Sequence, residues 1–112
     1  MVASATELEK IISDFVKRLQ QGIDVEAIIL YGSYARGTAY DQSDIDLAVI
    51  SPDFEGVPLF RRQEVIAELT LRRDRRITPI GYPPSEYLNP GRHSFLGEII
   101  RTGKVVYQAV RQ

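Results

Sequence analysis

The sequence lacks cysteine and tryptophan altogether, and it contains a single histidine, His93. Without cysteine the chain cannot form a disulfide framework, a cysteine-ligated zinc site, an iron–sulfur cluster or a thiol nucleophile. No run of residues approaches the ~18 consecutive apolar residues that cross a membrane, and the N-terminus shows no signal-peptide pattern. We therefore expect a cytoplasmic protein with no membrane association.

The sequence also lacks an excess of charge of either sign. Its 14 Lys and Arg residues face 15 Asp and Glu residues, which gives a net charge of −1 and a pI of about 5.8. Because binding along a phosphate backbone needs a basic excess, this balance does not favour a nucleic-acid partner. With 112 residues, 44% of them hydrophobic, the chain suits one domain, which we expect to cover residues 1–112.

Hydrophobic periodicity predicts helices and short strands that together suit an α/β (α+β) domain. The expected helices cover residues 6–21, 58–73 and about 95–100, and the expected strands cover residues 25–31, 44–50, 76–82 and 104–110. Thr6 and Glu9 predict a capping box at the start of the first helix, and Gly22 predicts a left-handed cap at its end. Pro79 predicts an edge position for the third strand, and the prolines of residues 83–85 predict a turn.

Gly32 and Ser33 follow the first expected strand. A glycine there lets the backbone turn sharply and approach a ligand closely, so that the next N–H groups can point at an anion. Arg36 lies three residues after Ser33, on the same side of a helical turn, and could reach a phosphate. On its own, a Gly-Ser pair is more typical of an ordinary loop.

Asp44 and Asp46 are separated by one residue, which places both carboxylates on one face of a strand. Two like charges this close repel each other unless a cation neutralises them, and oxygen ligands on a rigid strand suit Mg²⁺. An isolated Asp-x-Asp pair is more often an exposed strand face. If the expected strands at residues 25–31 and 44–50 are neighbours, however, a turn that can bind phosphate faces a pair of carboxylates that can bind a metal. Nucleotidyl transfer requires both of these features.

The string GSYARGTAYDQSDIDLAV, residues 32–49, combines both features with ten residues between Ser33 and Asp44. This pattern resembles the signature of the polymerase-β-like nucleotidyltransferase superfamily, and the whole string is most similar to the minimal nucleotidyltransferases (MNT proteins). The resemblance implies a polymerase-β-like fold in which helices pack against a small mixed sheet. It also implies that Gly32 and Ser33 bind the triphosphate of ATP or another NTP, assisted by Arg36. Asp44 and Asp46 are then the catalytic residues that hold Mg²⁺ or Mn²⁺.

The same resemblance implies a partner, because MNT proteins often pair with a small helical HEPN-domain protein in a toxin–antitoxin or two-component module. In some pairs the MNT protein transfers AMP from ATP to a tyrosine of its partner. The expected activity of this chain is therefore transfer of AMP to a hydroxyl of a protein partner, as the antitoxin-like half of such a module.

The sequence departs from the superfamily at the third catalytic carboxylate. Thr78 occupies the place in the third strand where an acid is expected. Asp74 is the nearest candidate, yet it lies four residues upstream, roughly 13 Å along an extended strand. Without this acid the site lacks a metal ligand or the base that activates the attacking hydroxyl.

Two other functions stay open. The chain could be a catalytically degenerate MNT-fold module that neutralises or scaffolds its partner by forming a complex, which the threonine at position 78 favours. It could also be a small-molecule nucleotidyltransferase, although 112 residues leave no room for an acceptor-binding domain unless a homo-oligomer builds one between subunits.

Overall fold

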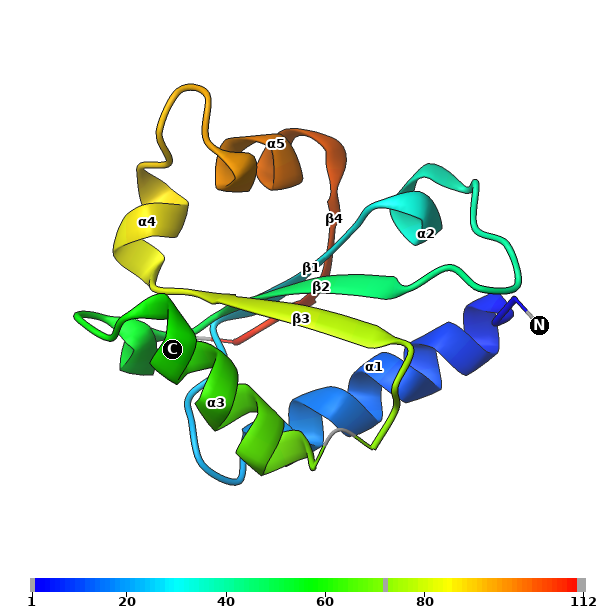
Figure 1. Ribbon diagram of the computed structural model, residues 1–112, viewed down its shortest axis with the longest axis horizontal. Helices are drawn as coiled ribbons and strands as arrows, with labels where there is room; N and C mark the ends of the chain where they lie inside the picture. Colours follow the sequence, from blue (N-terminus) through cyan, green and yellow to red (C-terminus); the bar gives the residue numbers. More distant parts are fainter. Residues whose placement is uncertain (1, 72, 111–112) are drawn as a thin grey trace.

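The computed structural model describes residues 2–71 and 73–110. Its elements in chain order are α1 (Ala5–Leu19), β1 (Ala27–Tyr31), α2 (Ser33–Arg36), β2 (Ile45–Ile50), the 3₁₀ turn η1 (Pro52–Phe54), α3 (Leu59–Thr70), β3 (Ile77–Tyr82), α4 (Pro84–Leu88), α5 (Phe95–Thr102) and β4 (Lys104–Gln108). The four strands form one sheet in the order β3-β2-β1-β4 (Figure 1). β1 is antiparallel to both β2 and β4, whereas β2 and β3 are parallel, so the sheet is mixed as expected.

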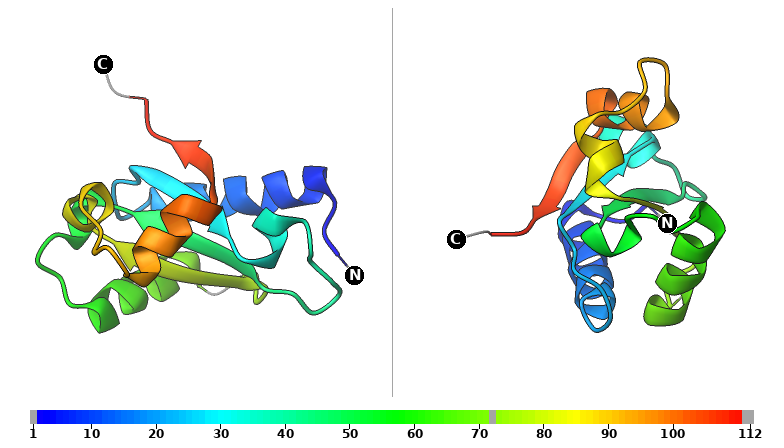
Figure 2. Two further views of the ribbon diagram at one scale, coloured as in Figure 1. Left: turned by 90° about the horizontal axis from the view of Figure 1, so that it is seen from above. Right: turned by 90° about the vertical axis from the view of Figure 1, so that its left-hand side faces the viewer.

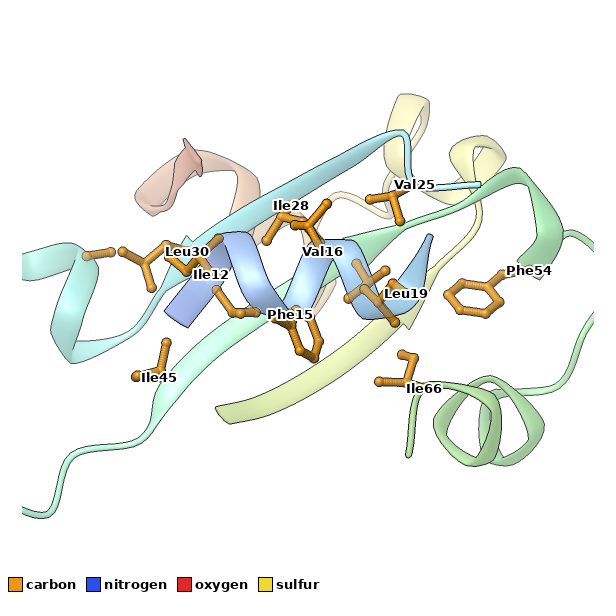
Figure 3. Packing of buried hydrophobic residues seen from close by; sticks show 13 residues of the cluster. Ile12, Phe15, Val16, Leu19, Val25, Ile28, Leu30, Ile45, Phe54 and Ile66 are labelled. Atoms are coloured by element: carbon orange, nitrogen blue, oxygen red, sulfur yellow. The ribbon is translucent and has the colours of Figure 1, made fainter. Parts of the chain in front are cut away.

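Helices cover both faces of the sheet. Figures 1 and 2 show α1 and α3 on one face, and α4 and α5 on the other. Because side chains alternate along a strand, the two central strands, β1 and β2, contribute to two separate cores. The first core joins α1, α3 and alternate residues of β1 and β2 around Phe15, Leu19 and Ile66 (Figure 3). The second joins the opposite residues of these strands to Leu96 and Ile99 of α5.

The first helix begins at Ala5, one residue earlier than expected, and its N-cap lies two residues earlier than the sequence pattern predicted. Ser4, not Thr6, is its N-cap, and the capping box pairs Ser4 with Glu7. The prediction of a left-handed cap at Gly22 is also wrong, because the helix ends at Leu19 and Gly22 is not among the glycines with positive φ. Gly22 instead allows close packing, since a β-carbon there would come within 2.5 Å of Leu69 Cδ2 on α3.

Other element boundaries also differ from the prediction. The second expected helix, α3, ends at Thr70 rather than near Arg73, because Leu71 adopts a left-handed conformation with φ 52° and ψ 20°. Pro58 precedes that helix as its N-cap instead of lying in its first turn. The prolines after β3 open the short helix α4 rather than a simple turn, which is compatible with proline because the first helical N–H groups need no partner within the helix. All four strands are shorter than expected by one or two residues at one end.

β3 lies at one edge of the sheet, as Pro79 predicted. Its outer side is closed by side chains of α3. Gln63 donates to Pro79 O at 2.8 Å and accepts from Gly81 N at 2.9 Å, and Arg62 donates to Gly81 O at 3.1 Å. These bonds replace the missing neighbour strand and hold β3 in register against β2.

Candidate functional site

The first half of the motif forms a tight turn from β1 into α2. Gly32 has φ 73° and ψ −152°, a conformation open essentially to glycine alone, and its carbonyl accepts from Arg36 N at 3.1 Å. Ser33 to Arg36 form the helical turn that the sequence predicted. Gly37, with φ 75° and ψ 21°, ends the turn in a left-handed cap. The backbone therefore turns back at both glycines and displays Ser33 and Arg36 beside the end of β1.

The second half of the motif lies at the start of the neighbouring strand. Asp46 is inside β2 and half-buried, whereas Asp44 is exposed and lies one residue before the strand, not within it as expected. Burial raises the pKa of Asp46, and the nearby Asp44 charge raises it further, while Arg36 partly offsets both effects. A half-buried carboxylate next to a second carboxylate is a donor set that suits a divalent cation.

The two halves of the motif meet at one pair of residues. A β-carbon on Gly32 would overlap Oδ2 of Asp46, so the carboxylate lies directly against the glycine backbone. The antiparallel register explains this contact, because it places Tyr31, the last residue of β1, opposite Asp46. The structure thus brings Gly32, Ser33, Arg36 and Asp46 together, with Asp44 at the entrance to β2.

Ser43 is a residue of this site that the sequence reading missed. It is 8% exposed and holds the loop before β2, since Tyr40 N donates to Ser43 Oγ at 2.8 Å and Ser43 N donates to Tyr40 O at 2.9 Å. These bonds form a closed turn immediately before Asp44. The only sequence signal for this role of Ser43 is its position directly before Asp44. That signal is weak, because small polar residues are common in loops.

Thr78 is the residue that the sequence predicts at the place of a third acid. Thr78 is the register partner of Asp46 in the parallel pairing of β2 with β3, and paired residues point to the same face. Asp74 does not reach this position. Its carboxylate accepts from Arg76 Nε at 3.0 Å and Arg76 Nη2 at 2.9 Å, and these hydrogen bonds lower the pKa of Asp74. Within residues 2–71 and 73–110, no group of three or more metal-ligating side chains gathers in one place.

An aromatic pair lines the same face of the sheet. Tyr31 packs edge-to-face with Phe95 of α5, with ring centroids 5.7 Å apart and an interplanar angle of 83°. Burial, with smaller contributions from Asp46 and Tyr82, raises the pKa of Tyr31 to about 12, so its phenol stays protonated at neutral pH. The sequence reading did not connect these residues, because 64 positions separate them and the contact depends on how α5 packs on β1.

A glycine turn beside two carboxylates at the start of a strand of a mixed sheet is the arrangement expected of nucleotidyl-transferring proteins, and comparison with known proteins assigns the chain to that class. The family model described as "Nucleotidyltransferase domain" matches residues 9–84. "Putative protein adenylyltransferase MJ1305" of Methanocaldococcus jannaschii is 31% identical over 105 residues, which cover 89% of this chain and 71% of that protein. "Protein adenylyltransferase MntA" of Thermococcus cleftensis is 40% identical over 52 residues, or 46% of this chain and 50% of that protein. The chain therefore belongs to the nucleotidyltransferase domain family, among MNT-like relatives.

Solved structures show the same fold. A crystal structure of a putative nucleotidyltransferase from Sulfolobus solfataricus matches with a TM-score of 0.69 and 17% identity, covering 89% of this chain and 79% of that one. A toxin–antitoxin structure with AMP-PNP matches with a TM-score of 0.57 and 23% identity, covering 87% and 73%. The polymerase-β-like fold expected from the sequence is thus confirmed. Among the described helices, none has the length and apolar character needed to cross a bilayer.

Proposed function

We propose that this chain is a metal-dependent nucleotidyltransferase that transfers AMP from ATP to a hydroxyl of a protein partner. The observation that carries the proposal is the contact of the Asp46 carboxylate with Gly32, which joins an anion-binding turn to an acidic pair. In this proposal residues 1–112 act as one minimal catalytic domain. The relatives named as protein adenylyltransferases and the AMP-PNP in the matching toxin–antitoxin structure support ATP as the donor.

Each residue of the motif has a distinct task in this proposal. Gly32 lets the triphosphate approach the backbone, while the Ser33 hydroxyl and N–H groups at the start of α2 donate to its oxygens. Arg36 adds positive charge on the same side. Asp44 and Asp46 would hold Mg²⁺ or Mn²⁺, which supplies charge neutralisation at the triphosphate when bound.

The reaction transfers one phosphoryl group with its adenosine. The acceptor oxygen forms a bond to the α-phosphorus, the bond from that phosphorus to the α,β-bridging oxygen breaks, and pyrophosphate leaves. The acceptor hydroxyl gives its proton to solvent or to a group of the partner, because Thr78 offers no carboxylate base beside Asp46. We therefore expect slow transfer compared with a site that has three acids.

The partner in this proposal is a HEPN-domain protein, for which the present chain serves as the antitoxin-like half. The support is that two matching crystal structures are toxin–antitoxin complexes, one of them described as MntA-HpeT. Calorimetric titration with ATP, with and without Mg²⁺, tests the donor site without knowledge of the acceptor. We expect Mg²⁺-dependent binding that the Asp44→Asn/Asp46→Asn double variant loses. Equal binding by that variant would reject the assignment.

A second function has its own supporting observation. With Thr78 beside Asp46 and Asp74 tied to Arg76, the site has two acids instead of three, which favours a non-catalytic module that neutralises its partner by forming a complex. Transfer of label from ATP labelled at the α-phosphate to a HEPN-domain protein separates the two functions. Under the first, the double variant loses both labelling and neutralisation. Under the second, the wild-type chain labels nothing and the variant still neutralises.

A further inference from the structure

Phe95 is the first residue of α5, and its side chain is exposed at the edge of the second core of the sheet. Its exposed fraction is 58%, whereas Leu96 and Ile99 of the same helix are 5% and 1% exposed. Leu96 and Ile99 therefore anchor α5, and the Phe95 ring adds little to that packing. The exposed part of the Phe95 ring is accessible to a ligand, and the ring contacts Tyr31 at the end of β1, next to the turn of the candidate site.

Tyr31 holds this ring in a defined orientation. The two rings meet edge to face at 5.7 Å and 83°, which is the favoured geometry for an aromatic pair. Tyr31 is itself half-buried, directly precedes Gly32 and lies opposite Asp46 in the sheet. Residues paired across two strands point to the same face of the sheet, so the Phe95 ring that contacts Tyr31 lies on the same face as the Asp46 carboxylate.

We propose that Phe95, positioned by Tyr31, is the stacking platform for the nucleobase of the donor nucleotide. The inference rests on the proposed function and adds an affinity element to it: the turn at Gly32 binds the triphosphate, and the aromatic ring binds the base. Every base has a π-face, so stacking adds affinity without selecting one base over another. The platform therefore increases the affinity for ATP and GTP alike.

The test compares a ligand that has a base with one that lacks it. ATP and inorganic tripolyphosphate are titrated calorimetrically with Mg²⁺ into the wild-type chain, Phe95→Leu and Phe95→Tyr. We expect Phe95→Leu to weaken ATP binding about 5- to 100-fold, the range of one base–aromatic stack, and to leave tripolyphosphate binding unchanged. Phe95→Tyr keeps the ring and restores ATP binding. Phe60→Leu is the matched control, because Phe60 is 70% exposed on α3, which packs on the opposite face of the sheet.

Two results would overturn the platform. ATP affinity could be the same in the wild type and Phe95→Leu, or Phe95→Leu could weaken binding of ATP and tripolyphosphate equally, which marks a structural role. Failure of the proposed donor site gives a different result from failure of the platform alone. If the wild-type chain binds neither ATP nor tripolyphosphate, the proposed triphosphate site is wrong, and the proposed platform is wrong as well. If the wild type binds both equally, the donor site stands and the platform does not.

Discussion

The Asp46 carboxylate lies so close to the α-carbon of Gly32 that a β-carbon there would overlap its Oδ2 atom. Glycine is thus required at this position for two reasons. Its φ of 73° with ψ of −152° disfavours any other residue, and the acidic side chain of the neighbouring strand fills the space that a side chain would take. The turn at Gly32 and the Asp46 carboxylate are consequently in direct contact.

Replacing Gly32 should impair ligand binding more than replacing Gly37 at the other end of the same turn. Gly32→Ala should cost about 1–3 kcal/mol of unfolding free energy, displace Asp46 and abolish Mg²⁺-dependent ATP binding. Gly37→Ala is a matched control, because Gly37 has a similar φ of 75° but nothing within 4 Å of the added β-carbon. It should cost about 1–2 kcal/mol and retain ATP binding. Loss of binding in both variants would mean that strain in the turn, not contact with Asp46, controls the site.

Neutralising Asp46 should change how stability depends on pH. The pKa of this carboxyl is raised above its usual value of 3.8, so the folded chain keeps the proton to higher pH than the unfolded chain. The wild type should therefore lose stability relative to Asp46→Asn as pH rises from below 3.8 through the raised pKa. Urea unfolding of both proteins between pH 3 and 7, without metal, measures the difference. A constant difference across that range would contradict the prediction.

Divalent cations should stabilise the wild-type chain but not the Asp46→Asn variant. Mg²⁺ or Mn²⁺ that binds Asp44 and Asp46 in the folded chain raises its melting temperature by mass action. Asp46→Asn removes one of the two carboxylates, so it should show no such rise, while the metal-free variant is at least as stable as the wild type. Thermal melts with millimolar Mg²⁺ or with EDTA provide the comparison, and an equal metal-induced rise in the variant would place the metal elsewhere.

Supplying the missing acid should strengthen the metal site. Thr78 is the register partner of Asp46, so Thr78→Asp would add a third carboxylate on the same face. We expect Mn²⁺ to bind on the order of tenfold more tightly, and the metal-free chain to lose up to about 1 kcal/mol through like-charge repulsion. Thr78→Asn has the same shape without the charge and should leave Mn²⁺ affinity unchanged. Equal affinities for all three proteins would show that position 78 does not reach the metal.

The end of α3 contains strain that can be relieved without touching the site. Leu71 is 67% exposed and has a left-handed backbone conformation, which leucine adopts at a cost. Because asparagine tolerates this conformation, Leu71→Asn should stabilise the fold by about 0.5–1 kcal/mol in urea unfolding. Leu88→Asn, at an 80% exposed leucine in α4, serves as the control and should give no gain. A gain in both would point to reduced surface hydrophobicity instead.

Local patterns located the elements well but not their ends. Ser4 with Glu7 and Thr6 with Glu9 both fit a capping box, and the structure forms the first pair. Gly22 has the position of a helix cap in the sequence, yet its role depends on Leu69, which lies 47 residues away. Cap motifs are local and repeat within a few residues, so they define a boundary only to about one turn.

The sequence by itself determined the family, the mixed α/β fold and the two halves of the candidate site, because the spacing from Ser33 to Asp44 and the Asp-x-Asp alternation are local properties of the chain. Only the tertiary structure decided which residues meet there. The parallel pairing of β2 with β3 places Thr78 beside Asp46, Asp74 is held by Arg76, and the packing of α5 places Phe95 against Tyr31. Strand register and helix docking arise from burial of apolar faces contributed by distant segments, and no local pattern specifies that pairing.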